Sequence, residues 1–281
     1  MKIFSITMLA IIAISFADCK RSNNNDLNVV GSDTMVQLAQ NMAAAYMKAN
    51  PEKRVAVRGG GSGTGIAALL NGSTHIANAS RKIKAKELES ARNLGIEIKE
   101  YIVGLDGVAV LINTRNPVEK LSIDQLSDIY SGKITNWKEL GGKDENIVVI
   151  SRENNSGTHV YFKEEVLRKG EKDNTTEFAK GTIYGVSSQQ IIDQVKANSN
   201  AIGYVGMGWI NDSVKAIKVS SSGTYHAPSV ENVKSDKYPI ARTLQMYVNQ
   251  KFSDKAEPFI QYVLSEQGQR IVTKLGFVPV K

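Results

Sequence analysis

The chain has 281 residues, of which 42% are hydrophobic and 22% charged, and its formal net charge at neutral pH is +7. A chain of this length exceeds what one small core can organise and fits either one large α/β domain or two lobes. Basic residues are interspersed with acidic ones and aromatic residues are few. This pattern argues against a nucleic-acid-binding surface and leaves a mild attraction for anions or anionic lipid surfaces.

Residues 1–18 have the pattern of a signal peptide, with Lys2 as the positive end. The uncharged stretch 3–17 is shorter than the roughly 20 residues that a membrane-spanning helix needs. We therefore expect the chain to be exported.

The sequence has a single cysteine, Cys19, which excludes an intrachain disulfide. Its place just after the apolar segment resembles the acylation site of a bacterial lipoprotein, although Phe16 and Asp18 stand where Leu and a small residue are usual. The Asn-rich residues 19–26 would then form a polar tether. We expect a periplasmic protein or a lipoprotein held to the membrane through Cys19.

The first strand-turn-helix unit begins at residues 28–30, where two valines follow Asn28 and predict a short strand. Apolar residues spaced for a helix follow over 35–48, and Pro51 closes that element. Ser32 and Thr34 lie between the two. The pattern therefore places two hydroxyl groups at a helix start.

A second unit has a predicted strand at 54–57, a glycine-rich turn at 59–65 containing Ser62, and a helix that we expect to begin at Ile66. The glycines permit a backbone path that curls around a ligand. The turn matches neither the Walker pattern, nor the dinucleotide pattern G-x-G-x-x-G, nor the nucleophile elbow G-x-S-x-G. The sequence therefore gives no sign of a nucleotide site here.

A third unit has an apolar strand at 147–150, a turn at 151–159 and a helix at 160–167. The turn carries a permanently charged guanidinium, two hydroxyls and a glycine, followed by the unpaired N–H groups of a helix start. These groups are Arg152, Ser156, Gly157 and Thr158. One such turn is commonly just a helix cap, but three of the same chemistry indicate a cradle for a small tetrahedral oxyanion.

These turns, in an exported chain of this size, resemble the phosphate-binding subunit of a Pst-type ABC transporter. The resemblance covers about residues 29–280 and depends most on Arg152 with the Ser-Gly-Thr run, then on 31–34 and 61–63. Further family-like runs are 105–110, 134–137 and 201–205.

The resemblance implies an α/β, two-lobed periplasmic-binding-protein fold of type II, in which each lobe is a sheet flanked by helices. Lobe one would comprise residues 27–108 plus 247–281, and lobe two residues 109–246. The crossing strands would lie near 107–110 and 243–248. The ligand would lie in the cleft between the lobes.

Carried over by position, the phosphate-contacting groups come from both lobes, so the bound anion would favour the closed form. We expect Ser32 to hold these groups in position or to cap the helix that follows. The predicted contacts are Thr34, the Met35 N–H and Ser62 from lobe one, and Arg152, Ser156, the Gly157 N–H and Thr158 from lobe two.

One departure from the family pattern concerns Ser80 and Arg81, which stand where many members have an Asp that accepts a proton from phosphate. Such an acceptor favours phosphate over sulfate, because sulfate has no proton to donate near neutral pH. We expect Arg81 to face the anion and to pair with another acid that takes over as acceptor. Asp106, at the predicted lobe crossing, is the first choice and Asp33 the second. The alternative for Arg81 is a surface position at a helix start.

The leading hypothesis is a non-enzymatic, monomeric binding protein that delivers inorganic phosphate to an ABC permease, with no cofactor and no nucleic-acid partner. The three histidines lack metal-ligand spacing. A second hypothesis keeps the scaffold but has it select sulfate, molybdate or tungstate. A third, a secreted phosphatase or Ser hydrolase, would need an activated nucleophile or a metal pair.

Overall fold

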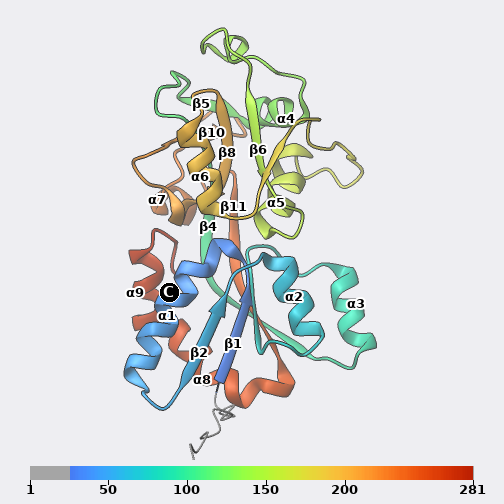
Figure 1. Cartoon of the computed structure of the whole chain (residues 1–281), viewed down its shortest axis with the longest axis vertical. Coiled ribbons are helices and arrows are strands. Elements are labelled where there is room, and N and C mark those ends of the chain that lie inside the picture. The colour runs from blue at the N-terminus through green and yellow to red at the C-terminus, as the bar shows by residue number, and fades with distance from the viewer. Residues whose placement is uncertain (1–25, 281) are drawn as a thin grey trace, which may run out of the picture.

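The computed structural model describes residues 26–280. The predicted signal peptide, Cys19 and nearly all of the predicted tether lie outside this range. Nine strands form one mixed sheet in the order β2-β1-β3-β11-β4-β8-β6-β7, with β9 paired to β4, and β5 and β10 form a second, two-stranded sheet. The two-lobed α/β fold expected from the sequence is confirmed (Figure 1).

The strands of the sheet are β1 (Asp26–Gly31), β2 (Arg54–Arg58), β3 (Ile76–Ala79), β4 (Ile98–Ile112), β6 (Val148–Arg152), β7 (Ile183–Gly185), β8 (Ala201–Gly206), β9 (Lys215–Ala216) and β11 (Ala241–Asn249). The short pair is β5 (Lys120–Ser122) and β10 (Lys218–Ser220). The α-helices are α1 (Val36–Ala49), α2 (Ser62–Leu70), α3 (Ala85–Asn93), α4 (Ile123–Ser131), α5 (Gly157–Phe162), α6 (Ser188–Ala197), α7 (Val230–Lys234), α8 (Ser253–Leu264) and α9 (Glu266–Lys274). Short 3-10 or π segments are η1 (Asp33–Met35), η2 (Trp137–Leu140), η3 (Lys163–Leu167), η4 (Met207–Trp209) and η5 (Gln250–Phe252).

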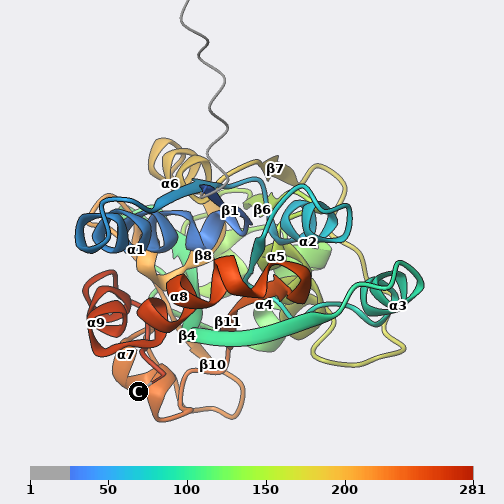
Figure 2. The same ribbon diagram turned by 90° about the horizontal axis from the view of Figure 1, so that it is seen from below.

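In the lower half of the molecule in Figure 1, one hydrophobic layer covers each face of the sheet. Side chains alternate between the two faces of a strand, so Leu244, Met246 and Val248 of β11 pack with α1, α8 and α9, whereas Tyr247 packs with α2 on the other face. Figure 2, seen from below, shows α8 and α9 beside α1, with α2 and α3 displaced to the opposite side. This half is therefore a three-layer α/β lobe.

The upper half repeats this construction around the second part of β4. Val108, Val110 and Ile112 point into one core, whereas Ala109 and Leu111 point into another with α6. β6 pairs in parallel with β7 and β8, so the turn after β6 lies at the carboxyl end of a parallel strand. Ligand-binding groups of open α/β sheets are found at this edge.

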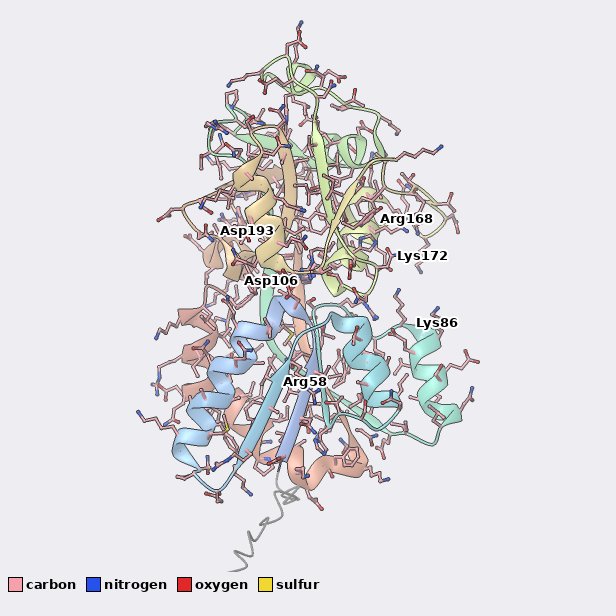
Figure 3. The ribbon with its side chains drawn as sticks, viewed as in Figure 1. Arg58, Lys86, Asp106, Arg168, Lys172 and Asp193 are labelled. Atoms are coloured by element: carbon pink, nitrogen blue, oxygen red, sulfur yellow. The ribbon has the colours of Figure 1, made fainter. Side chains whose placement is uncertain are left out.

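The two halves are joined by β4 and β11, which pair antiparallel along their shared length. β4 has 15 residues, and its successive parts belong to the two cores. Cross-strand register places Arg242 directly opposite Asp106. Figure 3 shows Asp106 at the narrow region between the halves.

Several element bounds differ from the sequence-based expectations. Helix α2 begins at Ser62 rather than Ile66, so the run Ser62-Gly63-Thr64-Gly65 forms its first turn. Glycine has a poor helix propensity, which is why the sequence read as a loop, but packing overrides that preference. β6 extends to Arg152, and α5 begins at Gly157 and ends in the π segment η3.

Within residues 26–280, no helix has the length and apolar content needed to cross a membrane. The expectation of lipid anchoring falls on residues outside that range and stays a prediction.

The α2–β1 packing depends on the absence of a side chain at Gly65. A Cβ atom there would lie 2.5 Å from the Val30 carbonyl oxygen and 2.6 Å from the Gly31 Cα. Because both neighbours are backbone atoms, we expect Gly65→Ala to lower the free energy of unfolding by about 1–3 kcal/mol, measured by urea denaturation. In the control Gly59→Ala, the nearest atom is a Val36 methyl carbon at 3.7 Å. Equal stability of the two variants would contradict the packing argument.

Candidate oxyanion site

Hydroxyl groups from both halves meet at the junction. The Thr34 and Thr158 Oγ1 atoms are 2.8 Å apart, although the residues are 124 positions apart in the chain. Ser32 donates to the Ser80 Oγ at 2.9 Å, and the Ser80 N–H donates to the Ser62 Oγ at 3.0 Å. These five buried side chains form what we call the hydroxyl cluster: Ser32, Thr34, Ser62, Ser80 and Thr158. The three predicted turns therefore converge on one place, together with Ser80.

The backbone at Gly157 fits against this cluster because it carries no side chain. A Cβ atom there would lie 2.2 Å from the Ser62 Oγ and 2.7 Å from the Ser80 Oγ. The Gly63 N–H also donates to the Asn155 carbonyl at 2.9 Å, and the Asn155 Nδ2 donates to the Gly60 carbonyl at 3.0 Å. Two glycine-containing turns from opposite halves thus meet backbone to backbone.

The start of α5 directs N–H groups toward the same place. Ser156 is the N-cap, and its Oγ accepts from the His159 N–H at 3.3 Å. The first N–H groups of a helix, here those of Gly157 and Thr158, have no acceptor inside the helix. The arrangement supplies amide donors beside the hydroxyl cluster.

Arg152 at the end of β6 is 1% exposed and bonds mainly to the chain around the start of α6. Its Nε donates to the Gly185 carbonyl at 3.3 Å, its Nη1 to the Ser188 Oγ at 3.0 Å, and its Nη2 to the Val186 carbonyl at 3.1 Å. Its Nη1 is also 3.2 Å from the Asp33 Oδ2. Burial lowers the pKa of Arg152 from its ordinary value, and the Asp33 carboxylate opposes this.

Asp33 lies in η1 of the lower half and links it to α6 of the upper half. Its Oδ2 accepts from both the N–H and the Oγ of Ser188, each at 2.7 Å. A carboxylate at a helix N-terminus is stabilised by the unpaired N–H groups there. Asp33, the alternative proton acceptor predicted from the sequence, therefore caps the start of α6 and pairs with Arg152.

Asp106 is completely buried and pairs with Arg242. The Arg242 Nε and Nη2 donate to the Asp106 Oδ2 at 3.1 and 2.7 Å, and the Met207 N–H donates to Oδ1 at 2.9 Å. Burial raises the pKa of Asp106 above its ordinary value, whereas Arg242 and the Met207 N–H oppose that rise. Arg242 also reaches the hydroxyl cluster, where its Nη2 donates to the Thr158 Oγ1 at 3.0 Å.

The predicted pairing of Arg81 with Asp106 or Asp33 is wrong. Arg81 forms a two-pronged ion pair with Glu87, its Nη1 and Nη2 lying 2.9 and 2.7 Å from the Glu87 oxygens. Glu87 also accepts from the Lys84 N–H at the start of α3. Because the acid is only six residues away, Arg81 finds a local partner.

Sequence reasoning missed Ser80 as a member of the cluster and Arg242 altogether. Ser80 follows the end of β3, where its position after a strand was an available signal. Arg242 is 136 residues from Asp106 and lies at the start of an apolar strand, so only the β4–β11 register reveals it.

A cavity of about 500 Å³ adjoins the junction on the side of Arg81, Tyr161 and Arg242, and another of about 710 Å³ is lined by Lys84, His159 and Tyr184. The structure as far as it is described contains no group of three or more His, Cys, Asp or Glu side chains that could hold a metal ion. The junction therefore offers neutral hydrogen-bond donors and two Arg–Asp pairs, of which Asp106–Arg242 is buried on both sides.

Comparison with known proteins agrees with this construction. The family model of the PBP superfamily domain matches residues 20–267. The phosphate-binding protein PstS of Bacillus subtilis is 31% identical over 288 residues, covering 97% of this chain and 90% of that protein. This chain belongs to the PstS family of the PBP superfamily.

Another PstS, from Borreliella burgdorferi, is 30% identical over 269 residues and covers 94% of each chain. Among solved structures, a Clostridium perfringens substrate-binding protein, assigned to phosphate ABC transport and containing bound phosphate, is 34% identical with a TM-score of 0.83. The match covers 92% of this chain and 100% of that one. The family resemblance expected from the sequence is thus confirmed for this PstS-family chain.

The buried imidazole of His159 makes stability depend on pH. Burial, and secondly Lys163, lowers its pKa from 6.5 to about 4. The unfolded chain binds a proton on acidification below about pH 6.5, whereas the folded chain does so only near pH 4, so folding stability is lost as pH falls through this window. We expect acidification from about pH 7 to about pH 4 to cost wild type about 2–3 kcal/mol more than His159→Gln, measured by urea denaturation.

The control His226→Gln keeps His159 and should therefore keep the wild-type dependence. If wild type and His159→Gln lost the same stability on acidification, His159 would not be the group responsible.

Proposed function

We propose that this protein binds inorganic phosphate outside the cytoplasmic membrane and delivers it to an ABC permease for import, without catalysing a reaction. Membership of the PstS family supports this proposal, as do relatives named as phosphate-binding proteins and the phosphate-containing Clostridium structure. The observation that carries it is the meeting of Thr34 and Thr158 across the two halves.

The phosphate ion takes the place of the bonds that these hydroxyl groups form with one another. Ser, Thr and amide donors satisfy anion oxygens well, and helix starts are favourable sites for negative charge. Because the donors come from both halves, the anion gains all of them only in the closed form and shifts the population toward it. The proposed contacts are Thr34, the Met35 N–H, Ser62, Arg152, Ser156, the Gly157 N–H and Thr158, with Ser32 supporting them through Ser80.

Asp106 is the proposed acceptor for the phosphate proton. Its burial in the cluster's wall, and the upward direction of its pKa, suit a carboxylate that shares a proton with an anion. Arg81 stays a prediction as an anion contact, and its terminal nitrogens are held by Glu87.

The proposed lobes are residues 27–108 plus 247–281 and residues 109–246. Separate hydrophobic cores support this division over most of the chain, but Leu244 and Met246 pack into the core of the lower half, and Val108 and Val278 into that of the upper half. We further propose that the protein acts as a monomer and is held to the membrane through Cys19.

Titration calorimetry with phosphate, sulfate and molybdate tests the function directly. We expect phosphate to bind most tightly and Arg152→Ala to weaken its binding by at least ~30-fold, because truncation removes a buried, hydrogen-bonded charge. A phosphatase assay should show no turnover. Preferential binding of sulfate or molybdate would instead assign the scaffold to another oxyanion, and hydrolysis of a phosphate ester would favour the enzyme hypothesis.

Replacing the proposed proton acceptor tests selectivity. We expect Asp106→Asn to reduce the preference for phosphate over sulfate, because an amide can donate to sulfate whereas a carboxylate repels it. The measurement is competition between the two anions. An unchanged preference would exclude Asp106 as the acceptor.

A further inference from the structure

We infer that Arg242, a residue outside the contacts expected from the family, is a direct ligand of the bound oxyanion and supplies positive charge to it. The inference rests on the proposed function and adds a residue that selects the charge state of the anion. It follows from how the guanidinium is held between Asp106 and the hydroxyl cluster.

One edge of the Arg242 guanidinium is fixed by Asp106. Its Nε and Nη2 both bond to the Asp106 Oδ2, and Nη2 also donates to the Thr158 Oγ1 at 3.0 Å. The two residues face each other across the β4–β11 ladder, so the pair is positioned by the backbone of both strands. The guanidinium plane is therefore fixed beside the cluster.

The other terminal nitrogen of Arg242, Nη1, takes no part in these bonds. Among residues 26–280, the Arg242 Nη1 has no hydrogen-bond partner although it is buried. The Arg242 side chain is 3% exposed. A buried N–H of a charged group that lacks a partner is costly, and such groups in proteins nearly always have one. Because Nη1 belongs to the same planar group as the nitrogen that contacts Thr158, an anion at Thr158 is within reach to supply that partner.

The Tyr161 ring limits where the guanidinium can move. The Arg242 Cζ atom lies 5.4 Å from the ring centroid, and the Tyr161 hydroxyl donates to the carbonyl of the neighbouring residue, Ala241, at 2.6 Å. A guanidinium above an aromatic face is attracted by the ring's electron density. Tyr161 and Asp106 together hold Arg242 in place before any ligand arrives, which lowers the entropy cost of binding.

The two other buried arginines of the junction, Arg152 and Arg81, have different hydrogen-bonding partners. Each nitrogen of Arg152 already has a protein acceptor, so its proposed contact with the anion would replace one of these bonds. Arg81 has an unpaired Nε, but its terminal nitrogens bond to Glu87 and to the Lys82 carbonyl rather than to the hydroxyl cluster. Arg242 alone of the three combines a bond to a cluster hydroxyl with an unpartnered terminal nitrogen.

This role has a consequence for the form of phosphate that binds. Inorganic phosphate changes from monoanion to dianion near neutral pH, and a fixed cation stabilises the dianion more strongly. Removal of the Arg242 charge should therefore weaken binding more above neutrality than below it. A residue that only supports the fold would weaken binding equally at both pH values.

The test is titration calorimetry with inorganic phosphate on wild type, Arg242→Gln, Arg242→Lys, Asp106→Asn and the double variant Asp106→Asn with Arg242→Gln. We expect Arg242→Gln to bind at least ~30-fold more weakly than wild type, with a larger ratio at about pH 8 than at about pH 6. Arg242→Lys should be intermediate, because a single ammonium cannot replace both edges of the guanidinium. Arg270→Gln, which removes the same charge from an exposed ion pair on α9, should bind like wild type.

The double variant separates ligand contact from stability. Removing both members of a buried pair is far less destabilising than removing one, so this protein should fold even if Arg242→Gln does not. If it binds phosphate as tightly as Asp106→Asn alone, Arg242 contributes nothing to the ligand and the inference is overturned. A pH-independent ratio between wild type and Arg242→Gln would overturn it equally. Failure of wild type to bind phosphate would overturn the proposed function and this inference with it.

Discussion

The pairing of β4 with β11 is the constraint on which the rest of the structure depends. These two antiparallel strands run from one core to the other, and their register sets Asp106 opposite Arg242 at the junction. A buried ion pair is retained only where its geometry and additional hydrogen bonds offset the loss of hydration. Here the Met207 N–H and Thr158 provide those bonds, so the pair is tied to the upper half as well as to the crossing strands.

The two Arg–Asp pairs of the junction differ in how they connect the halves. Asp106 and Arg242 lie on the crossing strands themselves, whereas Asp33 and Arg152 lie in opposite halves and meet at the start of α6. If the halves move apart as the proposed function requires, the second pair separates, so it would favour the closed form even without an anion. Under the proposed function, the affinity for phosphate would reflect both the contacts to the anion and the stability of this closure.

The sequence predicted the three turns because strand and helix periodicities are local properties, and hydroxyl residues at helix starts are recognisable from residue type. The prediction that these turns meet in a cleft between two lobes came from the family resemblance. The partners of Arg81 and Arg242 could not be assigned in the same way. Glu87 lies only six residues from Arg81 and also caps the start of α3, so a local pair was within reach of the sequence. The partner of Arg242, in contrast, depends on pairing between strand residues 136 positions apart.

The beginning of α2 shows a different limit. Gly63 and Gly65 disfavour a helix by intrinsic propensity, yet the helix begins at Ser62 because the missing side chains let its backbone approach β1 and Asn155. A glycine-rich run is ambiguous between a flexible loop and a tightly packed helix start. Only the surrounding surfaces decide between these outcomes.

The sharing of β4 between two cores also affects how the molecule comes apart. Unfolding of either half removes hydrogen-bonding partners and apolar neighbours from a strand on which the other half is built. The halves are therefore not separate cooperative units, and loss of one propagates to the other as a single transition. Amide protons in the middle of β4 should then exchange only through global opening, so the strand that both lobes share belongs to the most protected backbone of the protein.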